Sequence, residues 1–369
     1  MGLQARIGIN LCFIPPGSLT GPGVYALRLI DELLNAHSYR WVIYCHVGLP
    51  LPDSWSERAW IRPVISTRRR PLRVAFEQLA LPLLARRDRI DLLFSPAFVS
   101  PMWGAPKLVA TIHDMYYAVT PESVPVWQRL YWRLFIPLTA RRCDRLLAVS
   151  QSTARDIGRL LPYAAPKTHV TPLACAVEDV DSPGEPVPGI EPGFVLMVAN
   201  IVANKNPSVL VKAASYLAAR GRRRQFVHVG QDHHGLLEAA ISNLKCTDLF
   251  HRLGRVSAAQ LRWLYRNALC AVQPSLYEGF GIPVLEAQMF RTPVLCSNAA
   301  SLPEVAGDGA LFFPPHDAEC LAALIDELAS NAALRSQLIE RGIANASRYS
   351  WAATAHATLN VFRNLLERK

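Results

Sequence analysis

The sequence lacks the features of a small cross-linked domain, of a metal-binding ribbon and of a membrane span. Its eight cysteines are scattered over 369 residues without a CxxC pair, which argues against a zinc ribbon and a disulfide scaffold and favours buried thiols in a reducing cytoplasm. Two long uncharged stretches, 7–27 and 92–106, are interrupted by prolines, so neither predicts a signal peptide or a spanning helix. We expect a cytoplasmic protein, with any membrane contact peripheral.

Charged residues are also scarce, at 18% of the chain, and acidic ones are the minority, which leaves a formal net charge of +10. The 51% apolar content excludes disorder of the whole chain. The positive charge favours a polyanionic partner, such as a nucleic acid, an anionic membrane or a phosphorylated substrate. Because no nucleic-acid-binding motif accompanies the charge, we disfavour nucleic acid.

Short apolar runs alternate with amphipathic segments along the chain, which predicts parallel α/β sheets whose strands are buried on both faces. Expected strands are 6–13, 41–47, 91–95, 108–112, 145–149, 169–171, 194–199, 225–229, 269–273, 293–297 and 310–313. Expected helices are 24–36, 73–87, 125–142, 151–161, 207–220, 234–244, 257–267 and 317–347. Residues 181–193 hold four prolines and three glycines and predict a linker. We therefore expect two doubly wound domains, 1–183 and 184–350, followed by a terminal helix over 351–369.

Three polar or glycine-containing segments follow predicted strands of these sheets, where α/β proteins bind ligands. Gly23 lies in a segment that formally fits the GxGxxA dinucleotide fingerprint, but the turn is late and no acid ends the second strand. His113 follows a buried strand, where it is either a structural residue or one that bonds a hydroxyl or moves a proton. Lys205 precedes a helix that begins near Pro207. A cation there opposes the helix dipole, so either a diphosphate lies between them or the lysine is solvated.

The fourth segment, QPSLYEGFGIPVLEAQ over 273–288, carries the strongest signal. Glu278 lies in a loop after a strand and Glu286 lies in the first turn of the following helix, where acids are also favoured for the helix dipole alone. The backbone amides of Gly279, Phe280, Gly281 and Ile282 could bind hydroxyls or an anion.

EGFGIPVLE resembles the E-x(7)-E motif of retaining glycosyltransferases, and is most similar to glycosyltransferase family 4. Further resemblances fall in the family's order at VATIHDMYYAVTPE (109–122), LLAVSQSTARDI (146–157), VTPLACAVEDV (170–180), LGRVSAAQLRWLYRNALCAVQPSLYEGFGIPVLEAQ (253–288) and SLPEVAGDGALFFPPHD (301–317). The resemblance implies a GT-B fold, in which two Rossmann-like domains face each other across a cleft and the C-terminal helix crosses back to the N-terminal domain.

By the same resemblance, Lys205 would hold the donor diphosphate, Glu286 the ribose hydroxyls, and Glu278 with the amides of Phe280 and Gly281 the sugar. His113 would lie at the reaction centre, and Gly23 would let the backbone approach the phosphate. The family usually places an arginine near this lysine, where the chain has Asn200 and Asn204; Arg255 is a candidate substitute. Arg291 stands where a glycine is common.

The implied reaction is retaining transfer of a sugar from a nucleotide-sugar donor to a glycan or polyprenyl-diphosphate-linked acceptor, by a front-face route without a metal ion or a covalent intermediate. GDP-mannose is the leading donor, and UDP-sugars and dTDP-rhamnose stay open. The residues alone leave a nicotinamide oxidoreductase, a retaining glycosidase and a binding module as alternatives. Basic segments at 68–73, 85–89 and 140–145 are either solvated helix faces or a docking surface for an anionic inner membrane.

Overall fold

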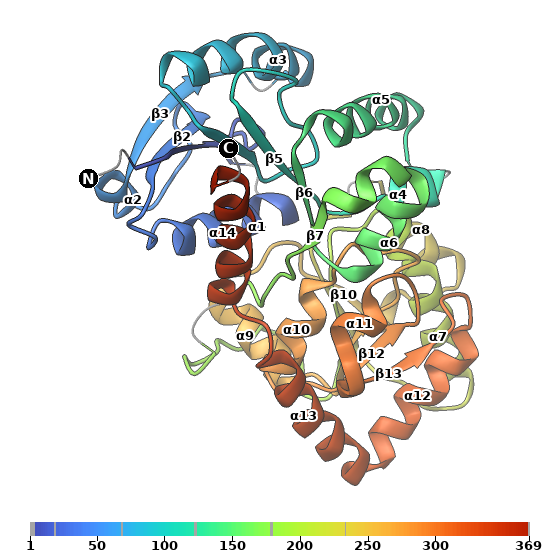
Figure 1. Cartoon of the computed structure of the whole chain (residues 1–369). Helices are drawn as coiled ribbons and strands as arrows, with labels where there is room; N and C mark the ends of the chain where they lie inside the picture. The colour runs from blue at the N-terminus through green and yellow to red at the C-terminus, as the bar shows by residue number, and fades with distance from the viewer. Residues whose placement is uncertain are drawn as a thin grey trace. The chain divides into compact units, whose positions relative to one another are not determined.

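The computed structural model of the chain describes residues 4–17, 20–67, 69–121, 124–177, 180–232 and 234–367 (Figure 1). The chain forms two compact units. The first combines 1–118, 126–173 and 350–369, and the second combines 119–125 with 174–349. The main divisions therefore fall after residues 173 and 349, compared with the predicted 183 and 350.

The first unit is built on a seven-stranded sheet in the order β3-β2-β1-β4-β5-β6-β7. Its strands are β1 (Arg6–Asn10), β2 (Arg40–His46), β3 (Ala59–Ile65), β4 (Leu92–Ser95), β5 (Lys107–Ile112), β6 (Arg145–Ala148) and β7 (Thr168–Val170). All neighbouring strands pair in parallel. The strand order reverses between β1 and β4, so loops that follow these two strands diverge there and leave room for a ligand.

Helices cover this sheet, as the first unit's part of Figure 1 shows. They are α1 (Gly21–Leu33), α2 (Trp55–Arg58), α3 (Arg70–Arg87), α4 (Tyr116–Val119), α5 (Val126–Arg142), α6 (Gln151–Leu160) and α14 (Trp351–Glu367). The terminal helix α14 packs against α1, and its Phe362 ring lies 5.3 Å from that of Phe94 on β4. The hydroxyl of Thr354 donates to the carbonyl oxygen of Pro172 at 2.6 Å, which ties α14 to the chain after β7.

The second unit holds a six-stranded parallel sheet in the order β10-β9-β8-β11-β12-β13. Its strands are β8 (Val195–Val198), β9 (Phe226–Val229), β10 (Phe250–Arg252), β11 (Cys270–Gln273), β12 (Val294–Ser297) and β13 (Ala310–Phe313). Its helices are α7 (Pro207–Ala219), α8 (Leu236–Asn243), α9 (Ala258–Asn267), α10 (Ile282–Met289), α11 (Leu302–Ala306), α12 (Ala318–Ser330) and α13 (Ala332–Ala346). This is the doubly wound order of dinucleotide-binding sheets, with the reversal between β8 and β11.

The fold departs from the sequence-based expectation at three places. Strands β3 and β10 were not expected. Both lie at sheet edges, and β3 contains Pro63, a residue that edge strands tolerate because part of their backbone makes no ladder bond. The single helix expected over 317–347 is divided in two, because the side chain of Asn331 accepts from the amide of Leu334 and caps α13 as a new helix. None of the helices in the described part of the chain has the length and apolar composition needed to cross a bilayer.

Candidate active site

The predicted donor-side residues lie at the reversal point of the second unit's sheet. Lys205 is in the loop between β8 and α7, and Glu278 is in the loop between β11 and α10. Pro207 and Pro283 each lie within the first two positions of the helix that follows. The missing N–H of proline costs no helical hydrogen bond there. The two helices therefore begin directly after the loops, and the loops carry the polar groups.

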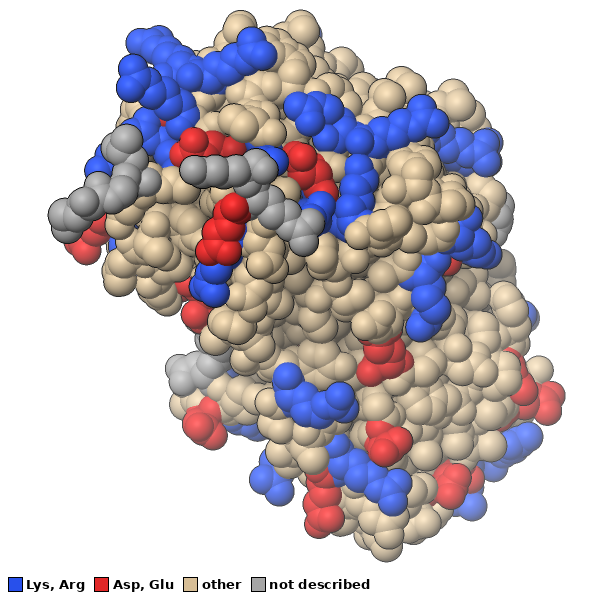
Figure 2. Space-filling model, in the orientation of Figure 1, with Lys and Arg blue, Asp and Glu red and all other residues tan. Residues whose placement is uncertain are grey.

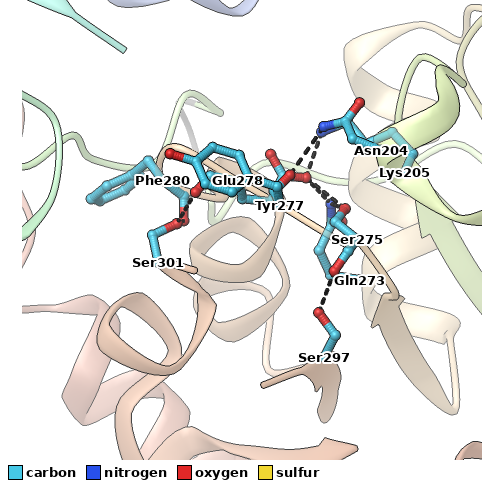
Figure 3. Close-up of polar contacts among 9 residues, drawn as sticks. All are labelled: Asn204, Lys205, Gln273, Ser275, Tyr277, Glu278, Phe280, Ser297 and Ser301. Atoms are coloured by element: carbon cyan, nitrogen blue, oxygen red, sulfur yellow. Dashed lines mark hydrogen bonds and ion pairs between the residues drawn. The ribbon is translucent and has the colours of Figure 1, made fainter. Parts of the chain in front are cut away.

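One oxygen of Glu278 receives three donors, as Figure 3 shows. Its Oε1 atom lies 2.5 Å from Lys205 Nζ, 2.7 Å from Gln273 Nε2 and 2.7 Å from Ser275 Oγ. The side chains of Lys205 and Glu278 retain 20% and 11% exposure. Among the described residues none donates to Oε2, so this oxygen can accept a hydroxyl of a ligand while Oε1 holds the ammonium in place.

Hydrogen bonds from neighbouring loops fix the backbone around Glu278. Ser301 Oγ lies within 2.9 Å of the carbonyl oxygens of both Glu278 and Phe280, and Asn204 Nδ2 donates to the carbonyl of Tyr277 at 3.0 Å (Figure 3). Gly281 has φ of +107°, and a Cβ there would lie 2.8 Å from a methyl carbon of Leu302. Glycine is required at this position both for the backbone angle and for the space. The loop therefore presents its amides in one fixed arrangement.

Glu286 occupies a different environment on the buried side of α10. It is 7% exposed, and its Oε2 accepts from the hydroxyl of Tyr265 at 2.7 Å. Burial raises the pKa of Glu286, and the Tyr265 hydrogen bond partly opposes that shift. The structure brings Lys205 and Glu278 into direct contact, whereas Glu286 shares no hydrogen bond with that pair among the described residues.

In the first unit, His113 follows β5 and is only 7% exposed. Its Nε2 lies 2.9 Å from the carbonyl oxygen of Pro96, and its ring lies 4.8 Å from that of Tyr25 and 5.3 Å from that of Phe98. Burial lowers the pKa of His113 to about 4, so the ring is neutral near pH 7. Since Nε2–H then donates to the carbonyl, Nδ1 is the acceptor. Gly23 is buried in the first turn of α1.

The remaining predicted residues have structural positions that the sequence left open. Arg255 is exposed in the loop after β10, and it makes no hydrogen bond or ion pair with the described residues. Asn200 Oδ1 accepts from the amide of Gln231 at 2.9 Å, so Asn200 and Asn204 both brace loops. Arg291 has φ of +62° directly after α10, the left-handed position in which glycine commonly ends a helix. This explains a preference for glycine there.

Several residues of the site were not found by sequence reasoning. Gln273, Ser275 and Ser301 contact Glu278 or its loop, and Tyr265 contacts Glu286. Gln273 and Ser275 are polar residues at the end of the strand and within the motif itself, and this position could have identified them as partners of Glu278. Tyr265 and Ser301 come from separate elements and carry no such signal. Among the residues that the structure describes, no group of three or more His, Cys, Asp or Glu is arranged to hold a metal ion.

Comparisons with known proteins match this architecture. The family described as "Glycosyltransferase Family 4" matches residues 19–179, and "Glycosyl transferases group 1" matches 186–345. The chain is 29% identical over 370 residues to the O-antigen chain mannosyltransferase B of Escherichia coli, which covers 94% of this chain and 97% of the relative.

Solved structures share the fold. Sucrose-phosphate synthase from Thermosynechococcus elongatus has a TM-score of 0.77 at 18% identity, covering 99% of this chain and all of that one. Anabaena HepE, solved in complex with UDP and glucose, has a TM-score of 0.70 at 16% identity, covering 98% of this chain and all of that one. The two Rossmann-like sheets are those of the GT-B fold, and the chain belongs to glycosyltransferase family 4.

Proposed function

We propose that the protein transfers a sugar from a nucleoside diphosphate donor to a glycan or lipid-linked acceptor in surface polysaccharide synthesis, with retention at the anomeric carbon. The observation that carries the proposal is the Lys205–Glu278 pair at the reversal point of the second sheet, the position where such sheets bind nucleotides. The leading donor is GDP-mannose. Its support is the similarity to an Escherichia coli mannosyltransferase along nearly the whole chain; UDP-sugars and dTDP-rhamnose are the competing donors.

Lys205 and the amides of Gly279, Phe280, Gly281 and Ile282 would bind the donor and stabilise the charge that develops on the leaving diphosphate. Fixed donors aimed at developing charge lower a barrier because they need no reorganisation. Glu278 would bind a sugar hydroxyl through its unoccupied Oε2.

Three further groups have proposed roles outside that contact. Glu286 would accept the ribose hydroxyls, Arg255 would supply a second cation for the diphosphate, and Gly23 would let the backbone approach it. His113, which is neutral, would accept a hydrogen bond from the transferred sugar at Nδ1. In the reaction the bond from the anomeric carbon to the diphosphate breaks, the acceptor oxygen bonds to the same face, and the acceptor proton passes to a phosphate oxygen. The route includes no metal ion.

The geometry favours a transferase over a retaining glycosidase. A glycosidase needs two carboxyl groups about 5 Å apart, one as nucleophile and one as acid. Here Glu278 binds an ammonium through Oε1 and Glu286 is buried against Tyr265, so each carboxylate has a binding partner that a nucleophile–acid pair does not require. A nicotinamide oxidoreductase would need an acid at the end of β2, which instead ends at His46.

A donor screen that measures nucleotide release tests the proposal, with GDP-mannose, UDP-glucose and dTDP-rhamnose as donors. We expect release with one of them, a product of unchanged anomeric configuration by NMR, and full activity in EDTA. Lys205→Ala and Glu278→Ala are the inactive controls. If calorimetry shows that NAD binds and that neither GDP, UDP nor dTDP does, the proposed activity is wrong.

We also propose that α3 and α5 dock the protein on an anionic membrane, where a polyprenyl-diphosphate-linked acceptor would be presented. On α3 the exposed apolar side chains are Leu72, Leu79 and Leu83, and on α5 they are Val126, Trp127, Leu130, Leu134 and Leu138. Basic side chains gather over the same part of the surface (Figure 2). Exposed leucines beside arginines are typical of interfacial helices, and each basic residue near an anionic surface adds about 1 kcal/mol. Arg68, at the start of the first basic segment, lies outside the described residues.

Flotation with vesicles of anionic or zwitterionic lipid tests the docking. We expect binding to anionic vesicles, and we expect Leu79→Glu with Leu130→Glu to reduce it at least fivefold. Val47→Glu is the matched control because Val47 is 54% exposed in the first unit and lies outside both helices. Equal flotation of the double variant and the control would refute the docking surface.

A further inference from the structure

The first unit contains a pocket of about 490 Å³ that the donor-side chemistry does not use. It lies where the order of the first sheet reverses, since its walls include Phe13 and Ile14 after β1 and Phe98 after β4. Its other walls come from α3 and α5, from Thr20 and Pro22 at the start of α1, and from Asp114 and Tyr116 after β5. The pocket therefore occupies the same topological position in the first sheet that the Lys205–Glu278 pair occupies in the second.

A buried carboxylate lines this pocket. Glu77 is 4% exposed, yet its contacts are long: Asn10 Nδ2 lies 3.5 Å from one oxygen and Arg73 Nε lies 3.8 Å from the other. Arg73 Nε is itself buried without a hydrogen-bond partner, although Nη1 of Arg73 donates to the carbonyl of Phe13 at 3.1 Å. Both distances exceed those of ordinary charged hydrogen bonds, so this pair has hydrogen-bonding capacity left for a ligand.

A second cation lines the pocket beside aromatic rings. The Arg70 guanidinium lies 4.5 Å from the ring centroid of Tyr131, 5.1 Å from that of Trp127 and 5.9 Å from that of Trp132. Among the described residues the side chain of Arg70 makes no hydrogen bond and no ion pair. Stacking restrains a guanidinium while leaving its N–H edges available to a planar or tetrahedral anion. The aromatic rings also offer faces on which the C–H groups of a sugar ring can pack.

The pocket connects to the residue predicted at the reaction centre. The ring of Phe98 lies 5.3 Å from that of His113 and 5.8 Å from that of Trp132. Phe98 thus forms a shared wall between His113 and the aromatic side of the pocket. A sugar seated against these rings would lie within one side chain of His113.

We propose that this pocket binds the acceptor as an anionic sugar, with ring hydroxyls on Glu77 and Arg73 and a phosphate or carboxylate on Arg70. The inference rests on the proposed transferase activity and specifies its acceptor class. Glu77 can accept hydrogen bonds from sugar hydroxyls. A site built only for a simple anion would not contain a carboxylate, because a carboxylate repels anions. Arg70 supplies the charge that a neutral sugar would not need. The combination selects a sugar that carries both groups.

Calorimetry on the full-length chain without donor tests this assignment, with mannose 1-phosphate, glucuronate, methyl α-mannoside and inorganic phosphate as probes. We expect the two charged sugars to bind at least tenfold more tightly than either the neutral glycoside or inorganic phosphate. The tighter of the two charged sugars identifies the anionic group as phosphate or carboxylate. We expect Arg70→Gln to remove the preference for charged sugars. Glu77→Gln should weaken all sugars at least tenfold without weakening inorganic phosphate.

Arg87→Gln is the matched control, since Arg87 is an exposed arginine on the same helix outside the pocket, and we expect it to bind as the unchanged protein does. Thermal denaturation checks whether the Glu77→Gln protein folds. If it does not fold, Arg70→Gln still tests the proposal, because Arg70 is half-exposed and its replacement leaves the core unchanged. Equal affinity for neutral and charged sugars, or an Arg70→Gln protein that keeps the preference, would overturn the assignment. So would loss of sugar-phosphate binding in Lys205→Ala alone, since this would place the ligand at the donor side.

The outcome for this pocket is separable from that for the transferase activity. Nucleotide release from a sugar donor with no anionic-sugar binding would refute the acceptor class and leave the transferase standing. Binding that depends on Arg70, without release from any nucleotide sugar, would refute the transferase and leave the pocket as a site for anionic sugars.

Discussion

Replacing Lys205 by alanine separates the energy of the reaction from the stability of the fold. In the free protein the lysine bonds Glu278 Oε1, which also accepts from Gln273 and Ser275. Lys205→Ala therefore leaves a carboxylate that still has two donors and 11% exposure. Because the carboxylate stays solvated by these groups, we expect the free energy of unfolding to fall by only about 1 kcal/mol.

The expected cost in the reaction is larger. Removing one fixed donor from a site of developing charge costs about 3 kcal/mol of barrier. At 1.36 kcal/mol per tenfold change, kcat/KM should fall by roughly a hundredfold or somewhat more. We therefore predict a loss of activity that is much larger than the loss of stability. A purely structural lysine would lower stability and activity together.

The assay combines nucleotide release with urea denaturation of the same preparations. Lys212→Ala is the matched control, because Lys212 is an exposed lysine on the adjoining helix α7; we expect both quantities unchanged. If Lys205→Ala keeps kcat/KM within threefold of the unchanged protein, the ammonium does not stabilise the leaving group and the reasoning from the Lys205–Glu278 pair is refuted.

For four further substitutions, the structure determines the direction of the expected change. Tyr265→Phe removes the donor that lowers the pKa of Glu286, so the acid limb of the activity profile should move to higher pH and the donor KM should rise; an unchanged profile would separate Glu286 from donor binding. Gly281→Ala forces a Cβ at positive φ to within 2.8 Å of Leu302 and should destabilise by about 1–3 kcal/mol, whereas Gly158→Ala inside α6, with space for a methyl group, should stabilise by about 0.5–1 kcal/mol; urea denaturation measures both. Burial holds the pKa of His113 at about 4 against an ordinary 6.5, so the unfolded chain takes up the proton first and stability falls as pH drops from 6.5 toward 4. His113→Gln should remove about 3 kcal/mol of that dependence, and parallel stability profiles of the two proteins would contradict it.

The sequence determined the sheet class and the strand ends that carry Lys205 and Glu278. Continuous apolar strands separated by amphipathic helices can only be buried on both faces, and this dictates parallel α/β units. The order of the segments around EGFGIPVLE then placed Lys205 and Glu278 after two strands that both lie inside one sheet. That their side chains touch follows from the strand order, in which β8 and β11 are neighbours. The separation of 73 residues along the chain does not determine this.

Edge strands and long-range partners were beyond the sequence. The β3 strand holds partly exposed and exposed residues and a single buried one, Ile65. It lacks the uniform apolar run that marks a central strand, so its pattern does not distinguish it from a loop. The Tyr265 hydroxyl bonds a group 21 residues away, and the Ser301 hydroxyl bonds two carbonyls 23 and 21 residues away. Such contacts depend on how helices and loops pack, and no local pattern encodes them.

The sequence by itself thus specified which charged and hydrogen-bonding side chains follow the strands, because the period of burial and the chemistry of turns are local properties. Only the tertiary structure decided which of them meet. It joined Lys205 to Glu278 and turned Glu286 toward Tyr265, and it assembled Glu77, Arg70 and the aromatic rings around one pocket. The physical reason is that hydrogen bonds and desolvation act over a few ångströms in space, and strand order, which depends on the packing of the whole unit, sets those distances.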